Sequence, residues 1–227
     1  FAMYAVSILL VILVGLALRS TLWRTMGTEP LLIDLPAYQR PTLRVMSSVT
    51  WMRLHGFLKT ATGIIVATVC VVWLLQALPA GTGEPTGDVP ASHSVYARVA
   101  EGISPVFEPA GFANWQSTGA LMTGFVAKEA VISSWAHAYA VDAPTHDGSR
   151  DLGAQIMADF ERSSHGHSGP AVLAFMVFLL AYTPCVATLA AQWREIGPRW
   201  TAFGVVVQLV LAYSLSVAVF QVGRLWW

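Results

Sequence analysis

The strongest candidate for chemistry is the sequence Tyr182-Thr183-Pro184-Cys185, near the middle of a long apolar stretch. Proline has no N–H to donate, so Pro184 leaves the Leu180 carbonyl without its helical partner and should kink or break the helix. In transporters, such discontinuous helices place carbonyls and helix ends beside ion sites. The thiolate of Cys185 would be a soft ligand, suited to transition metals such as ferrous iron. A packed proline kink with a small buried cysteine explains the tetrapeptide equally well.

Lys128 and Glu129 are a second candidate, because they are adjacent charges within the otherwise apolar stretch 116–140. One charge at the centre of a membrane helix costs about 2.5 to 3.5 kcal/mol on insertion scales, which favours a functional reason for it. On one helix the two side chains would point about 100° apart and could not simply pair with each other. Glu129 is then the better group for attracting a cation. A structural ion pair with another helix, or shallower insertion, is the alternative.

Two further motifs are weaker. His165 and His167 lie in a Ser- and Gly-rich segment, which favours a solvated loop over a metal site. Residues 119–124 have the glycine spacing of a phosphate-binding loop, but apolar residues follow where lysine and serine or threonine are needed. The sequence holds no metalloprotease motif, nucleophile elbow or paired carboxylates, so we expect no enzyme in this segment.

The composition indicates a membrane protein. Of the 227 residues, 55% are apolar and 11% are charged, and the mean hydropathy is +0.57. Thirteen basic and thirteen acidic residues give a net charge of zero, so the chain lacks the basic face that binding to nucleic acid needs. Neither Cys70 nor Cys185 has the spacing of a disulfide framework. Cys70, with no proline or charge around it, is expected only to pack.

Four apolar stretches approach the roughly 20 residues that cross about 30 Å of hydrocarbon: 2–18, 57–78, 170–192 and 200–222. The stretch 116–140 is a fifth, which either spans or forms a broken or re-entrant element. We predict an all-α fold: a polytopic membrane helical bundle with about four to five membrane-embedded helices, one of them broken at Pro184-Cys185. The first stretch has no charged leading segment, so we expect the sequence to begin inside a larger polytopic protein and not with a signal peptide.

The connecting segments have predicted sides and shapes. Residues 19–59, which connect the first two stretches and include the start of the second, hold six basic and two acidic residues, so the positive-inside rule makes this connection cytoplasmic. The loop 79–115 holds one basic and four acidic residues and should lie on the other side. Beyond residue 116 the count is a tie. Residues 43–59 should form an amphipathic interfacial helix, and 81–90 and 142–169 should be solvated loops.

Five blocks of sequence share the order of one known family. They are LPAYQRPT at 35–42, TW at 50–51 with GFLK at 56–59, ISPVFEPAGF at 103–112, TGFVAKE at 123–129, and YTPCVAT at 182–188 with RE at 194–195. Together they resemble the C-terminal membrane half of the ferrous iron transport protein B family. Each block is weak alone, but five in register over residues 31–213 are highly specific.

The resemblance implies a ferrous iron importer with two related Gate halves, also found in nucleoside-transporter-like proteins, of which this chain holds the second. The proline-cysteine block of the family contributes to the metal path, which implies this role for Cys185 with Pro184 and Thr183. Glu129 would be a secondary cation-attracting group on the path. Gating or structural roles are implied for two further residues, Lys128 and Gly124. Fe2+ would be the transported substrate.

Other partners are implied by the family alone. Its cytosolic GTP-binding domain and first Gate half have no counterpart here, so GTP and Mg2+ would act only through a missing N-terminal part. This chain alone should then neither hydrolyse GTP nor form a whole pore. The lipid bilayer of the bacterial inner (plasma) membrane, a small accessory cytosolic protein and a homo-oligomer complete the expected partners. Residues 142–167 fit no pattern of the family.

We divide the chain into four parts on this basis. Residues 1–30 would be the end of a preceding span and the start of a cytoplasmic loop, and 31–78 an interfacial amphipathic helix followed by a transmembrane helix. Residues 79–115 would be an extracytoplasmic loop, and 116–227 the second Gate-type membrane region.

Two hypotheses from other classes stay open. A Gate-type transporter of nucleosides or other small solutes would need polar side chains for base and ribose, and the spans offer few: Gln116, Thr123, Gln192 and Gln208. A non-transporting membrane scaffold would leave Lys128 and Glu129 unexplained.

Overall fold

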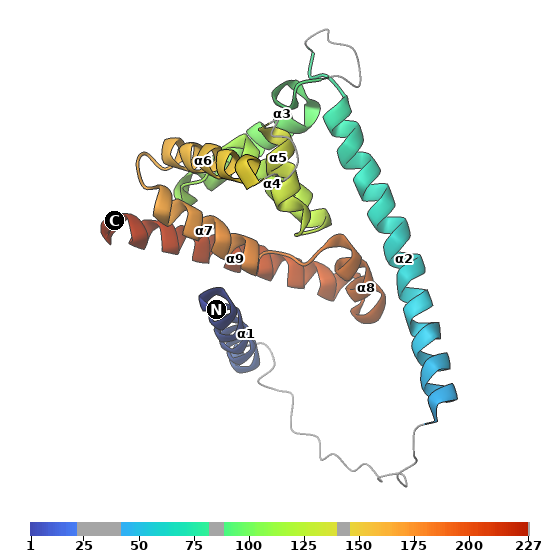
Figure 1. Cartoon of the computed structure of the whole chain (residues 1–227). Helices are drawn as coiled ribbons and strands as arrows, with labels where there is room; N and C mark the ends of the chain where they lie inside the picture. Colours follow the sequence, from blue (N-terminus) through green and yellow to red (C-terminus); the bar gives the residue numbers. More distant parts are fainter. Residues whose placement is uncertain (22–41, 82–88, 140–145, 227) are drawn as a thin grey trace. The chain divides into compact units, whose positions relative to one another are not determined.

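The structure, a computed structural model, describes residues 1–21, 42–81, 89–139 and 146–226 (Figure 1). These residues form nine α-helices and two short 3-10 helices, η1 and η2, which confirms the all-α prediction. The chain divides into two compact units, Phe1–His55 and Gly56–Trp227. The first resemblance block, at 35–42, lies almost wholly outside the described residues.

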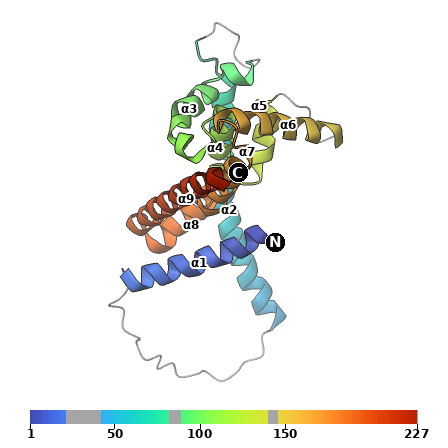
Figure 2. The same cartoon turned by 90° about the vertical axis from the view of Figure 1, so that its left-hand side faces the viewer.

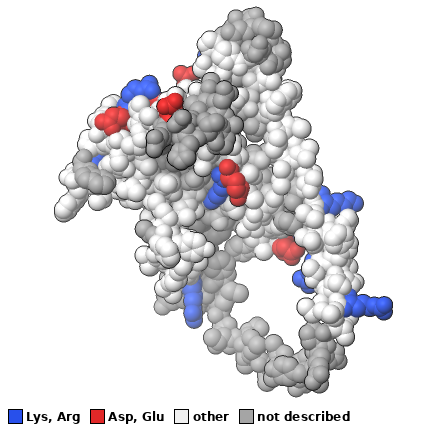
Figure 3. Space-filling model, viewed as in Figure 1, with Lys and Arg blue, Asp and Glu red and all other residues white. Residues whose placement is uncertain are grey.

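Among the described residues, three helical segments are long and apolar enough to cross a membrane: Met3–Thr21, Ser168–Ile196 and Pro198–Trp226. They coincide with three of the four predicted stretches. The chain is therefore a multi-pass membrane protein. Charged atoms are sparse on the face shown in Figure 3, as the composition requires.

The first unit begins with helix α1 (Ala2–Thr21). Helix α2 (Leu43–Ala77) belongs partly to the first unit and partly to the second. The predicted interfacial helix 43–59 and the apolar stretch 57–78 are one uninterrupted helix of 35 residues, about 52 Å long. No proline interrupts this sequence, and single glycines do not end a helix on their own. Its apolar part is Ile65–Ala77.

The segment that follows is folded against the rest of the second unit. It contains η1 (Ala91–His93), α3 (Val95–Ile103) and η2 (Ser104–Ala110). The Ser94 hydroxyl accepts a hydrogen bond from the Ala97 N–H and so caps α3. Gly111 ends η2 at a φ of 80°, and a Cβ there would overlap the ring of Phe220, so both the backbone and the packing require glycine.

The stretch 116–140 forms two short helices, α4 (Trp115–Val126) and α5 (Ala130–Ala138). They are about 18 and 14 Å long, so neither crosses 30 Å of hydrocarbon alone. The Tyr96 hydroxyl ties them together: it donates to the Gly119 carbonyl and lies 2.7 Å from Thr123 Oγ1 and 3.2 Å from Ser134 Oγ. Of the two alternatives for this stretch, the structure has the broken element, a helical hairpin.

Helix α6 (His146–Ser163) contradicts the prediction that 142–169 is a solvated loop. Leu152, Ile156 and Phe160 recur every four residues and so share one face of the helix. Phe160 on this face is buried against Phe175. This apolar stripe is narrow, and the many polar residues around it made the segment resemble a loop.

Helices α7 (Ser168–Ala181), α8 (Val186–Ile196) and α9 (Pro198–Trp226) complete the fold. α9 lies antiparallel along α7, since Ser216 Oγ donates to the Ala174 carbonyl at 2.9 Å and Gly223 packs on Pro170 (Figures 1 and 2). An aromatic core joins η2, α6, α7 and α9 and includes Phe107, Phe112, Phe160, Phe175, Phe178, Tyr182 and Phe220.

Candidate functional site

The predicted break lies between α7 and α8. α7 ends at Ala181, and Tyr182 and Cys185 have extended backbones with ψ of 176° and 158°. Pro184 explains this locally, because it offers no N–H and its ring disfavours helical geometry at the preceding residue. The last helical bond of α7 runs from the Tyr182 N–H to the Phe178 carbonyl at 2.8 Å. The discontinuous helix predicted from Pro184 is therefore present.

Cys185 is the N-cap residue of α8. Its carbonyl accepts the N–H groups of Thr188 at 2.9 Å and Leu189 at 3.1 Å, which starts the helix. Its Sγ lies 3.3 Å from Thr188 Oγ1 and is partly exposed. A sulfur at a helix N-terminus faces N–H groups that have no helical acceptor, and these favour negative charge. Thr183, by contrast, is only 2% exposed.

Tyr182 anchors the break to the aromatic core. Its ring stacks on Phe178 at 5.6 Å between centroids, and its hydroxyl donates to the Leu121 carbonyl of α4 at 3.3 Å. Gly124 makes this contact with α4 feasible. A Cβ there would lie 3.0 Å from the Tyr182 hydroxyl and 2.8 Å from Val131 Cγ2, so any side chain would push the break away.

The second predicted pair, Lys128 and Glu129, lies in the turn between α4 and α5, where Ala127 is extended with φ of −152°. The premise that both stand on one helix is therefore wrong. Lys128 Nζ donates to the Leu179 carbonyl at 3.0 Å and lies 4.9 Å from the Tyr182 ring centroid. Leu179 is in the last turn of α7, whose carbonyls have no helical donors, and a cation there is favoured by the helix dipole.

Lys128 thus joins the two breaks. Its ammonium interacts electrostatically with both Cys185 and Glu129, and Glu129 with Cys185. Glu129 is exposed and Lys128 half-buried. We call Lys128, Glu129, Thr183, Pro184 and Cys185 the break region. The sequence could not show that the two motifs meet, because their contact joins residues 51 positions apart.

Two family models match the chain. The Gate family, described as "Nucleoside recognition", matches residues 58–199, and "Ferrous iron transport protein B C terminus" matches residues 1–53. The chain belongs to the ferrous iron transport protein B family. It holds the C-terminal Gate region of that family, as the five sequence blocks predicted.

Curated relatives agree over almost the whole chain. The Fe(2+) transporter FeoB of Methanocaldococcus jannaschii is 33% identical, over 99% of this chain and 32% of the relative. That of Staphylococcus aureus strain MSSA476 is 31% identical, over 99% of this chain and 31% of the relative. A Porphyromonas gingivalis fusion of Fe(2+) transport protein A with FeoB is 28% identical, over 99% of this chain and 30% of the relative. The chain spans about a third of the length of these relatives. No solved structure matches it.

Three further residues that the sequence singled out, Cys70, His165 and His167, do not belong to the break region. Cys70 is exposed on α2. His165 has a φ of 56° in the turn before α7, and the His167 ring contacts the Ser164 carbonyl. Within the described ranges, no three His, Cys, Asp or Glu residues gather as metal ligands. A metal at Cys185 would therefore need backbone, amide, hydroxyl or water oxygens, or residues outside those ranges.

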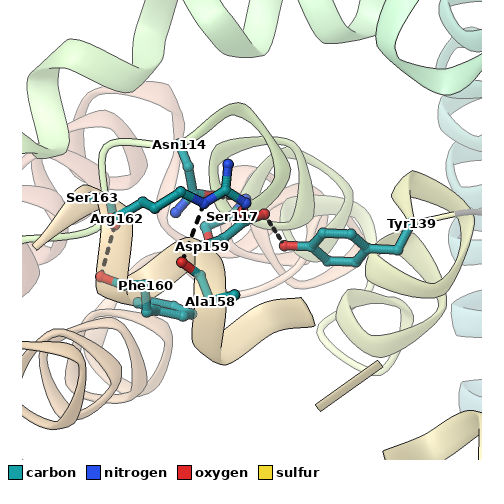
Figure 4. Close-up of polar contacts among 8 residues, drawn as sticks. All are labelled: Asn114, Ser117, Tyr139, Ala158, Asp159, Phe160, Arg162 and Ser163. Carbon is teal, nitrogen blue, oxygen red and sulfur yellow. Dashed lines mark hydrogen bonds and ion pairs between the residues drawn. The ribbon is translucent and has the colours of Figure 1, made fainter. Parts of the chain in front are cut away.

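A second polar cluster links α5 to α6 (Figure 4). Asp159, 4% exposed, accepts hydrogen bonds from the Tyr139 hydroxyl and from Arg162, one on each carboxylate oxygen. Burial, together with the neighbouring carboxylate, raises the pKa of Tyr139, so the phenol stays protonated and able to donate. We call Tyr139, Asp159 and Arg162 the α5–α6 lock. The sequence does not reveal this lock, because its members come from two helices and one of these was expected to be a loop.

Proposed function

We propose that this chain is the membrane part of a ferrous iron importer and that Cys185, with Pro184 and Thr183, lies on the metal path. The observation that carries the proposal is the contact between the two helix breaks, which gathers a thiol, a carboxylate, a lysine and free helix ends in one region. Discontinuous membrane helices supply ion sites through such backbone groups. A thiolate adds the softness that selects ferrous iron over magnesium or calcium.

The lysine and the carboxylate have separate roles in this proposal. Lys128 holds the end of α7 through the Leu179 carbonyl, so its release would free the break to move. Gly124 lets α4 approach Tyr182 and keeps the break in place. Glu129 is exposed and attracts the cation towards Cys185. Gating thus depends on Lys128 and Gly124, whereas attraction of the cation depends on Glu129.

The hairpin supports one of the two topologies between which charge counting left a tie. If α4 and α5 enter and leave on the same side, residues 79–169 all lie outside and the turn with Arg194 and Arg199 lies in the cytoplasm. Helix α2, the break-bearing α7–α8 segment and α9 then cross, and α1 precedes them. The membrane is the bacterial inner membrane in this proposal.

The rest of the transporter would supply what this chain lacks. A GTP-binding domain, with GTP and Mg2+, and a first Gate half would lie in the remaining two thirds of the relatives' length. The Porphyromonas gingivalis relative is named as a fusion with Fe(2+) transport protein A, which supports a small accessory cytosolic partner for this chain. A homo-oligomer in the lipid bilayer would complete the assembly.

The test is Cys185→Ser in the full-length protein, with uptake of ferrous iron measured in cells that depend on it. We expect uptake to fall at least about tenfold, because serine loses the soft ligand while keeping the size. Cys70→Ser is the matched control and should leave uptake unchanged, since Cys70 is exposed on α2. Normal uptake by Cys185→Ser at normal expression would remove the cysteine from the metal path.

A stability assay separates this function from nucleoside transport. Under reducing conditions ferrous iron should raise the Tm of the purified protein, because a ligand that binds the folded state stabilises it. Nucleosides should not. Stabilisation by nucleosides alone would favour the Gate-type solute transporter instead.

A further inference from the structure

Gln208 in α9 carries an unexplained polar atom. Its Oε1 is buried, and no donor in the described part of the chain reaches it. A buried amide oxygen without a partner is unfavourable, so its retention calls for a reason. The function proposed above does not use this residue.

The face of α9 that bears Gln208 is the one packed on α7. Ala212 and Ser216 follow Gln208 at four-residue spacing and therefore lie on its side of the helix. Both are buried, and Ser216 Oγ donates to the Ala174 carbonyl of α7 at 2.9 Å. Gln208 therefore faces the α7–α8 side of α9 and not the lipid.

Along the axis of α7, Gln208 lies at the same height as the break between α7 and α8. From Ala174, eight residues along α7 lead to Tyr182. From Ser216, eight residues back along the antiparallel α9 lead to Gln208. At 1.5 Å per residue both steps are about 12 Å in the same direction, so Gln208 lies opposite the start of the break.

We infer that Gln208 Oε1 is an oxygen ligand for the cation that passes Cys185, and thus a specificity-determining residue of the break region. An amide oxygen is a neutral, moderately hard ligand, and together with the thiol it forms a mixed sulfur and oxygen set that suits a borderline divalent transition metal. The lone pairs stay unpaired in the protein because the cation is their partner. This inference rests on the proposed function, since it takes Cys185 to be a ligand.

The test uses Co2+ as a spectroscopic probe of the full-length protein, reduced and purified in detergent. A thiolate bound to Co2+ gives a charge-transfer absorption band. The fraction of this absorption that is lost in Cys185→Ser comes from Co2+ bound at Cys185. Gln208→Leu should keep that absorption and raise the Kd for Co2+ about tenfold, as loss of a supporting ligand does. Gln208→Glu, which retains an oxygen and adds charge, should lower the Kd.

Gln221→Leu is the control, because Gln221 is on the same helix but its Nε2 is bonded to the Pro109 carbonyl at 2.8 Å. It should leave the Kd unchanged. A Kd for Gln208→Leu within twofold of the parent, with the Cys185 absorption present, would overturn the role of Gln208 and leave that of Cys185 intact. If Gln208→Leu does not fold, an unchanged Kd for Gln208→Glu overturns it in the same way. Absence of the Cys185 absorption in the parent protein would refute the proposed metal path and this inference together.

Discussion

The break region and the α5–α6 lock are two polar clusters of the Gly56–Trp227 unit. They differ in how far their polar atoms have hydrogen-bond partners. In the lock, each oxygen of the buried Asp159 carboxylate has a donor, from Tyr139 or Arg162. In the break region, Lys128 donates to the Leu179 carbonyl, and the Cys185 sulfur is partly exposed.

This difference separates stability from function. A buried polar cluster whose members are all paired stabilises one arrangement of the helices, and it offers nothing to a ligand. A cluster with spare lone pairs and an accessible thiol contributes less to stability but can bind a cation. Variants of the lock should therefore change unfolding and spare transport, whereas variants of the break region should affect transport more than their cost in stability explains.

The largest effect on stability is expected for Asp159→Ala. It leaves the half-buried Tyr139 hydroxyl without its acceptor and opens a small cavity at the buried Asp159 side chain, which together should lower the free energy of unfolding by about 2 to 3 kcal/mol. The ion pair with Arg162 adds little to this figure, because the Arg162 side chain is 76% exposed. Thermal unfolding in detergent measures the loss. Specific uptake per folded molecule should stay normal, and a loss of uptake as large as that of Cys185→Ser would contradict the separation.

Gly124→Ala should have the next largest effect, and here both properties should change. The new Cβ would lie 2.8 Å from Val131 Cγ2 and 3.0 Å from the Tyr182 hydroxyl, so α4 and the break must move apart. Such overpacking costs about 2 kcal/mol. Uptake should fall more than for Asp159→Ala although the protein is no less stable. Gly153→Ala on α6, where a Cβ meets open space, is the matched control: helix propensity should raise the unfolding free energy by about 0.5 to 1 kcal/mol, and uptake should not change.

Lys128→Met tests the bond that joins the two breaks. Loss of a charged donor to the Leu179 carbonyl should lower the unfolding free energy by about 1.5 kcal/mol. The end of α7 should then move more freely, so we expect faster labelling of Cys185 by a maleimide and reduced uptake. Lys128→Arg retains a donor and should restore slow labelling. Unchanged labelling in Lys128→Met would show that Lys128 does not hold the break.

These regions also show what the sequence can predict. Pro184 breaks its helix through local backbone chemistry, so the α7–α8 break follows from the sequence. The hairpin in the stretch 116–140 was one of two alternatives. Adjacent charges in an apolar stretch disfavour a continuous spanning helix, but they do not show which other structure the stretch adopts. The contacts between Lys128 and Leu179 and between Tyr139 and Asp159 are non-local. They depend on how helices pack, which neither propensity nor spacing records.

The smallest predicted effect, that of Tyr139→Phe, tests the lock most specifically, because it removes one hydroxyl and leaves the ring. The free energy of unfolding should fall by about 1 kcal/mol at neutral pH, as one half-buried hydrogen bond is lost. The raised pKa of Tyr139 in the folded protein gives this contribution a pH dependence. It is fully present below the pKa of an unfolded tyrosine, about 10, and is lost as the pH rises above it, since the unfolded chain then ionises while the Tyr139 phenol of the folded protein stays protonated. The difference in unfolding free energy between the parent and Tyr139→Phe, measured by denaturant titration at pH 8 and pH 11, should therefore shrink at the higher pH. A difference that stays constant would show that the Tyr139 hydroxyl is not held by Asp159 in the folded state.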